Sequence, residues 1–248
     1  MSEKLNLIMP NWPAPANVKA LQTTRVGGIS LAPYNSLNLG SHVKDNPLHV
    51  AHNRQVLSQL LPSEPVWLNQ VHGTLVLNAG VVDATSTDCL PDADASYSMR
   101  KNVVCVTMTA DCLPILVCDT AGTLVASIHA GWRSLCDGVI EATIAKLPVD
   151  SNQLMAWLGP AIGSSAFEVG AEVRAQFIAK DAKAEAAFKP HGDKYLGNLY
   201  QIATQRLNNL GVTQIYGGGL CTYTDKDQFF SFRRDGVTGR MATLIWME

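Results

Sequence analysis

The stretch between residues 103 and 134 constrains the fold of this chain more than any other. Its sequence is VVCVTMTADCLPILVCDTAGTLVASIHAGWRS. It contains three continuous apolar runs of strand length, Val103–Met108, Ile115–Cys118 and Leu124–Ile128. Apolar runs without polar alternation are typical of strands that are covered on both faces. We therefore expect these residues to form neighbouring buried strands of one sheet.

The ends of these strands carry residues suited to chemistry, because loops at strand ends commonly hold binding and catalytic groups. Cys112 stands at the start of one strand and His129 at the end of the next, with the turn Asp119–Gly122 between them. If the two strands are antiparallel, Cys112 and His129 lie at the same edge of the sheet. His72 follows a further strand signal, Val66–Val71. Our hypothesis is that these three side chains meet.

The rest of the chain mixes helix and strand signals, which favours an α/β (α+β) fold with a mixed β-sheet core flanked by helices. No repeat, linker or low-complexity segment divides the 248 residues, so we expect one domain over residues 1–248. Residues 1–20 contain three prolines between positions 10 and 15 and are expected to form an irregular arm. The patterns further predict helices over 46–61, 139–147, from about 171, and over 196–210, strands over 21–25, 153–158 and 215–216, and a C-terminal hairpin within 229–248.

Composition and charge exclude several classes of protein. The formal charge of −2 and the scattered Lys and Arg residues give no basic surface for nucleic acid or an anionic membrane. No apolar run approaches the length of a membrane span, and the N-terminus lacks the apolar core of a signal peptide. The six cysteines form no CxxC pair, and Cys105, Cys118, Cys136 and Cys221 lie in or beside apolar segments. We therefore expect reduced thiols in a cytoplasmic protein.

One cysteine and two histidines are compatible with two kinds of catalytic site. As metal ligands, His72, Cys112 and His129 form a set that suits zinc, and three protein ligands leave the fourth position open. As a nucleophile, Cys112 would be activated by His129, with Asp111 or another polar group orienting the imidazole. Cys112, His129 and Asp111 would then be the catalytic residues of a cysteine hydrolase or acyl-transferring enzyme. A buried thiol with hydrogen-bonded loop histidines is the third interpretation.

Four further residues are candidates for contacts with a substrate. Glu168 is the only acid of a Gly-rich loop that opens onto a helix, where free backbone N–H groups suit a phosphate or carboxylate. Arg25 precedes a two-glycine turn, and Arg233 and Arg234 cluster with Arg240 near the C-terminus. Because a guanidinium matches phosphate oxygens bidentately, Arg25, Arg233 and Arg234 are candidate anion-binding residues.

Other histidines and acids have simpler interpretations. His49 and His52 share one face of the predicted helix at i, i+3, which would allow a metal pair, but no acid or cysteine lies nearby and a solvated face is expected. Asp88, Asp92 and Asp94 belong to a polar loop that is expected to be solvated. Asp94, before a small residue, is a candidate carboxylate for supporting a residue of the site.

The chain contains, in order, the motifs NQVHG, TADCLPILVCD, IHAGWR, LGPAIG with FEVG, GGLCT, and FFSFRRDG with TGRMA. As a set they resemble the laccase-domain family, whose members are called YfiH-like proteins, polyphenol oxidases or purine nucleoside phosphorylases. The resemblance runs from about Thr23 to the C-terminus and implies a single-domain α/β or α+β fold also seen in bacterial cysteine-type toxin deamidases. It implies one zinc ion bound by His72, Cys112 and His129. One departure is Lys44, where family members often have a glycine.

The resemblance further implies purine nucleoside phosphorolysis. Phosphate would attack the ribose C1′ of adenosine, inosine or methylthioadenosine and release the base and a sugar 1-phosphate. Purine nucleosides and phosphate would be the partners, and adenosine deamination a further activity. The phosphate needs a cation, for which Arg25, Arg233 and Arg234 are candidates, and the departing base needs a proton donor, for which Asp111 and Glu168 are candidates.

Two other activities linked with the family stay open. Polyphenol oxidation by a multicopper site needs several coppers and many histidine ligands. Because the chain has six histidines, Cu²⁺ in place of Zn²⁺ and an oxidase activity are expected to be secondary. Editing of peptidoglycan precursors would make the substrate a nucleotide-linked or peptide intermediate.

Overall fold

A six-stranded mixed sheet forms the centre of the computed structural model, which describes residues 5–84 and 90–248. In spatial order its strands are β12 (Gln214–Gly217), β8 (Leu154–Leu158), β6 (Leu113–Asp119), β7 (Val125–Ala130), β4 (Ala95–Ser98) and β3 (Val76–Asn78). The pairs β12–β8 and β3–β4 are parallel, and the other neighbours are antiparallel. Every residue of β6, β7 and β8 is buried, so these strands form the middle of the molecule.

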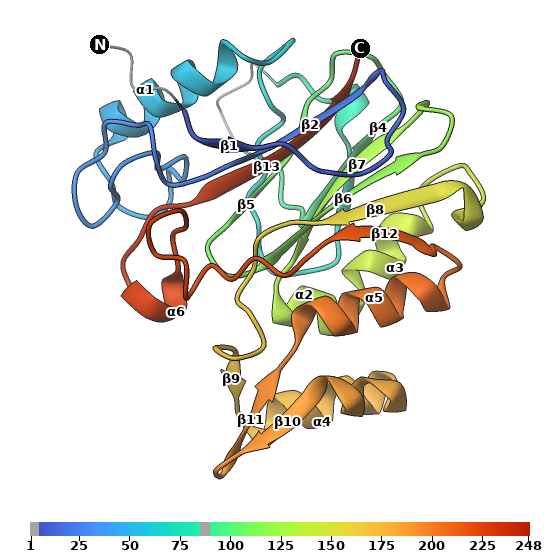
Figure 1. Ribbon diagram of the computed structural model, residues 1–248. Coiled ribbons are helices and arrows are strands. Elements are labelled where there is room, and N and C mark those ends of the chain that lie inside the picture. Colours follow the sequence, from blue (N-terminus) through green and yellow to red (C-terminus); the bar gives the residue numbers. More distant parts are fainter. Residues whose placement is uncertain (1–4, 85–89) are drawn as a thin grey trace.

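A second, antiparallel sheet covers one face of the central sheet. In spatial order its strands are β1 (Leu7–Ile8), β2 (Val18–Thr23), β13 (Met241–Met247) and β5 (Cys105–Thr109). Strands β5 and β13 contact β6 and β7, and the two sheets lie one upon the other in Figure 1. The chain is therefore layered, with its C-terminal strand packed against strands from the middle of the sequence.

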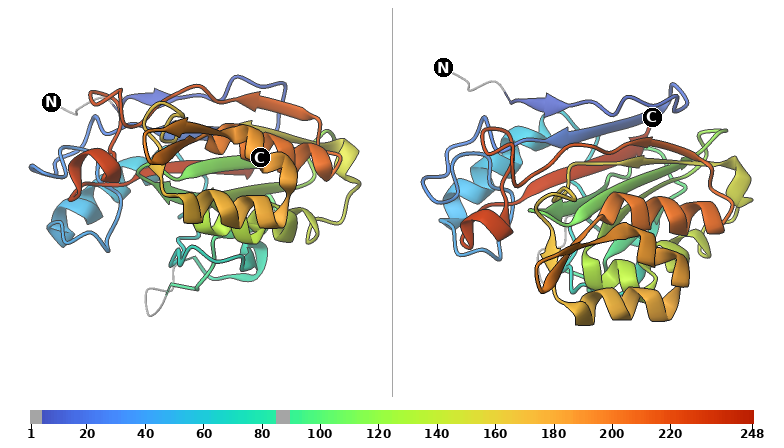
Figure 2. Two further views of the ribbon diagram at one scale, coloured as in Figure 1. Left: turned by 90° about the horizontal axis from the view of Figure 1, so that it is seen from below. Right: turned by 60° about the horizontal axis from the view of Figure 1, so that its bottom comes forward.

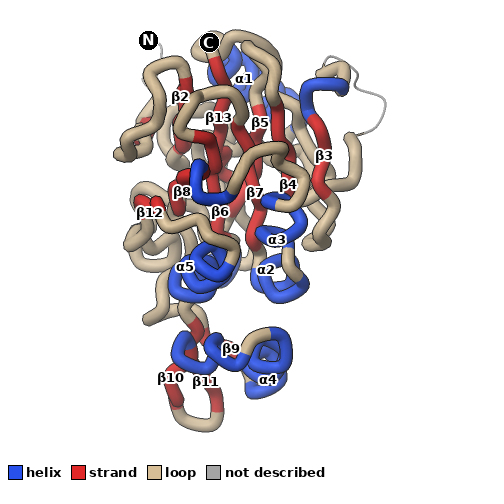
Figure 3. Tube along the Cα trace, turned by 90° about the vertical axis from the view of Figure 1, so that its right-hand side faces the viewer, coloured by secondary structure: helices blue, strands red, loops and turns tan. Residues whose placement is uncertain are grey.

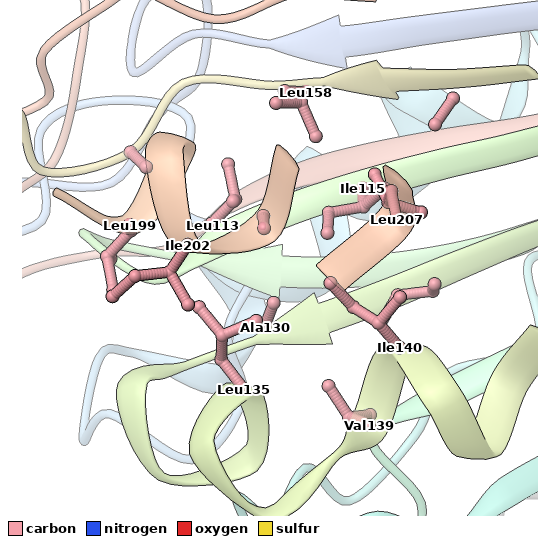
Figure 4. Packing of buried hydrophobic residues seen from close by; sticks show 14 of the residues in the cluster. Leu113, Ile115, Ala130, Leu135, Val139, Ile140, Leu158, Leu199, Ile202 and Leu207 are labelled. Atoms are coloured by element: carbon pink, nitrogen blue, oxygen red, sulfur yellow. The ribbon is translucent and has the colours of Figure 1, made fainter. Parts of the chain in front are cut away.

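Helices α2 (Trp132–Asp137), α3 (Val139–Ile144) and α5 (Leu199–Asn209) cover the opposite face of the central sheet. Gly138 separates α2 from α3 because its φ of 100° lies in the left-handed region that favours glycine. Figure 4 shows this core, in which Leu135, Val139, Ile140, Leu199, Ile202 and Leu207 of the helices meet Leu113, Ile115, Ala130 and Leu158 of the strands.

The continuous apolar run of β6 follows from these two covers. Ile115 and Val117 pack into the core under the helices, whereas Leu116 and Cys118 pack into the core under the second sheet. Successive side chains of a strand point to opposite faces, so a strand between two apolar layers needs apolar residues throughout. The prediction of buried strands in this region and of an α/β fold with flanking helices is confirmed.

The remaining elements lie at two ends of the molecule. Helices α1 (Pro47–Ser58) and α6 (Phe232–Asp235) lie at one end, as the views of Figures 1 and 2 agree. A small lobe below the helical layer in Figure 3 consists of β9 (Glu168–Val169), α4 (Ala171–Lys180), β10 (Phe188–His191) and β11 (Lys194–Gly197). Three short 3-10 helices are Ala79–Val81, Ser151–Gln153 and Ala182–Ala187.

Several predicted elements need correction. The irregular arm over residues 1–20 contains β1, which pairs Leu7 with Thr23, and the start of β2 at Val18. The strand predicted over 66–71 is absent, because Val66 and Asn69 make isolated bridges to two different segments. Helix α2 was not predicted, and α5 begins at Leu199 because residues 194–197 form β11.

The predicted C-terminal hairpin is wrong. The Ser231 hydroxyl accepts a hydrogen bond from the Arg234 N–H and begins α6, which ends before Gly236. Serine is a favoured residue at a helix N-terminus. The segment expected to form the first strand of the hairpin therefore forms a short helix instead. Strand β13 pairs instead with β2 and β5.

Candidate active site

The pairing of β6 with β7 brings Cys112 and His129 to one edge of the central sheet. The register places Leu113 opposite Ala130 and Pro114 opposite His129. Cys112 directly precedes β6, and His129 lies at the end of β7. The prediction that the two strands are antiparallel and carry both residues to the same edge is confirmed.

His72 joins this pair from a loop. Its backbone φ of 60° lies in the left-handed region, and its Nε2 atom lies 3.7 Å from Cys112 Sγ. The rings of His72 and His129 meet edge to face with their centroids 4.8 Å apart. The candidate ligand atoms of the three residues all lie within 4.8 Å of one another. Across residues 5–84 and 90–248, this His72–Cys112–His129 cluster is the one group of three or more such side chains placed to hold a metal ion.

Solvent reaches the cluster from one side, because His72 is exposed, Cys112 is half-buried and His129 is buried. Burial by itself raises the pKa of Cys112, but the charges and hydrogen bonds of His129 and His72 lower it below its usual value. For His129 burial alone lowers the pKa, but the Cys112 thiolate and Asp94 raise it above its usual value. Both directions favour a thiolate, the form of cysteine that binds metals and acts as a nucleophile.

Asp94 links the two histidines from a fully buried position. Its Oδ1 atom lies 2.8 Å from His129 Nδ1 and accepts the His72 backbone N–H at 2.9 Å. Its Oδ2 atom accepts the Gly73 N–H at 2.6 Å. Burial raises the pKa of Asp94, but His129 and these N–H groups lower it below its usual value. A carboxylate on Nδ1 fixes the imidazole and leaves Nε2 free, the arrangement common behind histidine ligands of metals.

Gly131 allows the cluster to be compact. A Cβ atom at this position would lie 2.7 Å from His72 Cδ2 and 3.1 Å from Cys112 Sγ. The backbone φ of −62° suits any residue, so the restriction is one of space. The sequence motif around Gly131 contains no sign of this contact, because the two neighbours come from elsewhere in the chain.

Asp111 ties the loop before Cys112 to the C-terminal segment. Its carboxylate accepts the Thr222 hydroxyl and the Arg233 backbone N–H, each at 2.6 Å. Its own φ of 100° is rare for a residue with a side chain, so these two bonds help hold an unusual turn. Asp94, and not Asp111, is the acid on the His129 imidazole. Thr222 was not singled out from the sequence, since its partner lies 111 residues away.

Arg25 and Arg234 line a polar groove of about 500 Å³ whose lining includes none of the cluster residues. Arg25 donates to the carbonyl oxygens of Asn35 and Lys226 at 2.9 and 3.0 Å. Arg234 donates to both carboxylate oxygens of Asp235. It also donates to the carbonyl oxygens of Thr222, Tyr223 and Phe229.

Glu168 and Arg233 lie where the lobe meets the rest of the molecule. The Glu168 carboxylate accepts from Lys194 Nζ at 2.8 Å and lies 3.0 Å from His191 Nδ1. The interaction with Lys194, and to a smaller extent that with His191, holds the pKa of Glu168 below its usual value. Arg233 donates to the Glu168 carbonyl oxygen at 2.7 Å, so it joins the Asp111 loop to the lobe.

A family model described as multi-copper polyphenol oxidoreductase laccase matches residues 19–248. The chain belongs to this family. Among relatives of this laccase-family chain, purine nucleoside phosphorylase YfiH of Shigella flexneri is 57% identical over 97% of this chain and 98% of the relative. Purine nucleoside phosphorylase PA4543 of Pseudomonas aeruginosa is 50% identical over 97% of this chain and 98% of the relative. The names of these relatives support the prediction that this chain is an enzyme.

Solved structures of the laccase family share the fold. The crystal structure of Neisseria meningitidis protein NMB0706 has a TM-score of 0.94 and 50% identity, over 98% of this chain and 99% of that chain. A Bacillus licheniformis hypothetical protein YfiH has a TM-score of 0.86 and 31% identity, over 93% of each chain. The expected YfiH-like fold is therefore confirmed.

Three smaller expectations also have structural outcomes. Lys44, for which the family resemblance predicts a glycine, adopts a φ of 69°, in the region that favours glycine. His49 and His52 lie on α1 and belong to no metal-binding group within the described part of the chain. None of the helices formed by residues 5–84 and 90–248 has the length and apolar character to cross a membrane.

Proposed function

We propose that this protein is a zinc-dependent purine nucleoside phosphorylase of the cytoplasm, acting as one domain over residues 1–248. The observation that carries the proposal is the His72–Cys112–His129 cluster, whose ligand atoms lie within 4.8 Å of one another. One thiolate and two imidazoles form a donor set that suits zinc, and three protein ligands leave one position for substrate or water. When bound, zinc would supply Lewis-acid charge at the reacting centre. Catalytic roles for Cys112 and His129 are part of the proposal.

Relatives named purine nucleoside phosphorylase support the substrate class. The proposed substrates are phosphate and adenosine, inosine or methylthioadenosine. An oxygen of phosphate would form a bond to ribose C1′ as the bond from C1′ to the base nitrogen breaks, which gives the free base and a sugar 1-phosphate. Adenosine deamination is proposed as a side activity, for which release of inosine from adenosine is the assay.

The chain's own residues would prepare the site for this reaction. Asp94 holds the His129 ring through Nδ1 and fixes the His72 backbone, so one imidazole is oriented and the backbone of the other residue is held before substrate arrives. Asp111 is proposed to hold the Cys112 loop through its bonds to Thr222 and Arg233. Contacts of Arg25, Glu168, Arg233 and Arg234 with substrate stay predictions from the sequence.

The test combines metal analysis with phosphate dependence. Protein purified without chelator should carry about one zinc per chain and convert adenosine to adenine only when phosphate is present. Cys112→Ala should lose both the zinc and the activity, whereas Cys221→Ala, which removes another half-buried thiol, should keep both. Release of free ribose without phosphate would contradict the proposal.

A cysteine hydrolase is the second candidate, because Cys112, His129 and Asp94 also form the sequence of thiol, imidazole and carboxylate used by cysteine nucleophiles. An active protein free of zinc, inactivated by alkylation of Cys112, would support this alternative. Polyphenol oxidation is proposed to be a secondary activity. A multicopper site needs several clusters of metal ligands, and the described residues contain one such cluster. Copper bound in place of zinc, with oxidase but no phosphorolysis activity, would reverse that order.

A further inference from the structure

We propose that Arg240 binds inorganic phosphate beside the His72–Cys112–His129 cluster. The inference rests on the proposed phosphorolysis, because it assigns the site of the second substrate. In the sequence, Arg240 is the third arginine of the C-terminal cluster that contains Arg233 and Arg234.

The strand register places Arg240 at the same edge as the cluster. Strand β13 is antiparallel to β5, with Met241 opposite Thr109. Arg240 directly precedes Met241, and the facing chain continues from Thr109 to Cys112. Its backbone N–H is fixed by a 2.9 Å hydrogen bond to Asn38 Oδ1, so its position does not depend on the side chain.

The guanidinium of Arg240 has donors to spare. Its Nη1 atom donates to the carbonyl oxygens of Thr238 and Gly239, both at 3.0 Å. Within the described part of the chain, its Nε and Nη2 atoms have no hydrogen-bond partner and no carboxylate at ion-pair distance. Its Cζ atom lies 6.0 Å from the ring of Phe232, whose side chain is 57% exposed. The free edge of a guanidinium presents two parallel N–H groups, which match two oxygens of a phosphate.

Arg240 lies within electrostatic range of the cluster and of the loop that precedes Cys112. Burial lowers the pKa of Arg240, and the negative charges of Cys112 and Asp111 act in the opposite direction, so the three groups are close enough to interact. Burial also lowers the pKa of His42, helped by the positive charges of Arg240 and two other basic residues. Asp111 is already bonded to Thr222 and to a backbone N–H. Arg240 and the other basic groups near His42 are the positive charges that an incoming phosphate would meet here.

Arg25, Arg54 and Arg234 each use at least two guanidinium nitrogens in hydrogen bonds, whereas Arg240 uses one. Arg25 and Arg234 donate to backbone carbonyl oxygens of the groove that they line. Arg233 donates to the carbonyl of Glu168 in the lobe. Arg54 stacks at 3.9 Å on a tryptophan ring and donates to a carbonyl oxygen. Arg240 is the one of these whose free edge is combined with an electrostatic link to Cys112.

The experiment uses the full-length, metal-loaded protein as wild type, Arg240→Gln, Arg240→Lys and Arg174→Gln. Arg174 is the matched control, because it pairs with Glu185 on the lobe. Calorimetry measures binding of inorganic phosphate, and steady-state kinetics separate the KM for phosphate from the KM for adenosine. Arg240→Gln should raise the Kd and KM for phosphate about ten- to a hundredfold and leave the KM for adenosine within about twofold. The Kd and KM of Arg240→Lys for phosphate should lie between those of wild type and Arg240→Gln. Lysine keeps the positive charge but lacks the two parallel N–H groups of a guanidinium.

Three outcomes would overturn the assignment. One is an unchanged Kd for phosphate in folded Arg240→Gln. Another is an equal loss of phosphate and adenosine affinity in both Arg240 variants with a lowered thermal midpoint, which indicates a structural role. The third is tighter, Arg240-dependent binding of adenosine 5′-monophosphate than of inorganic phosphate, which would assign the oxyanion to a nucleotide. If wild type binds phosphate through Arg240 but releases no base, the anion site stands and the proposed phosphorolysis fails.

Discussion

At the scale of single residues, Asp94 is the side chain on which the geometry of the cluster depends most. Its carboxylate holds His129 Nδ1 at 2.8 Å and accepts the His72 and Gly73 N–H groups. Asp94→Asn keeps the shape but removes the charge and turns an N–H₂ group toward one of these donors. We expect zinc affinity to fall about 10- to 100-fold, measured by competition with a chromophoric chelator. Asp92→Asn, whose exposed carboxylate bonds only Asn69 among the described residues, is the control. Equal affinities in the two variants would show that Asp94 does not orient the ligands.

Gly131 gives a second residue-scale prediction, in which space alone is changed. Gly131→Ala would place a methyl group 2.7 Å from His72 Cδ2, closer than real contacts allow. We expect the variant to fold, because its φ of −62° is ordinary, but to bind zinc at least tenfold more weakly. Gly73→Ala, where the nearest side-chain atoms would be 3.6 Å away, should bind zinc like wild type. Zinc binding by Gly131→Ala at wild-type strength would mean that His72 moves freely.

At the scale of elements, α5 supports the site through one phenol. Tyr200 Oη accepts the Ala161 N–H at 2.9 Å and lies 2.6 Å from the Leu220 carbonyl oxygen, so it joins the loop after β8 to the loop before Thr222. Tyr200→Phe leaves the buried Ala161 N–H with only a long 3.4 Å contact to the Leu220 carbonyl oxygen. The variant should lower the free energy of unfolding by about 1–3 kcal/mol, measured by urea denaturation. The control is Tyr195→Phe, whose hydroxyl has no hydrogen bond within the described residues. Equal free energies of unfolding in the two variants would contradict the role of Tyr200 in joining these loops.

The elements also show where sequence patterns suffice. The β6–β7 pair was predictable because two buried strands joined by a short turn have few alternatives to antiparallel pairing, and that pairing fixes Cys112 beside His129. The segment 229–248 was misread because Ser231 forms a helix cap, a local hydrogen bond that outweighs the apolar pattern. Asp94 was a candidate for a supporting carboxylate from the sequence, but its bonds to His129 and His72 could not be predicted. Neither could the contacts of Arg240, because both sets depend on segments that are distant in the sequence and adjacent only in the fold.

At the scale of the whole molecule, the fold should not depend on the metal. The three candidate ligands lie at an edge of the central sheet, whereas the core under the helices is closed by fully buried residues such as Ile115, Ile128 and Ile202. A zinc finger lacks such a core and unfolds without its ion. We expect chelation to leave the far-ultraviolet circular dichroism unchanged.

Chelation should nevertheless lower the thermal midpoint, because an ion that binds only the folded state stabilises it by about 4 kcal/mol at a thousand times its Kd. Cys112→Ala, which removes one ligand, should have a midpoint much less sensitive to added zinc. Scanning calorimetry of wild type and this variant, each with zinc and with chelator, measures both effects. Unfolding of wild type on chelation would make the metal structural, and would remove the reason to place an open, reactive position at the cluster. A folded metal-free protein whose stability rises with zinc only when Cys112 is present would instead place the ion where the open side of the cluster meets solvent.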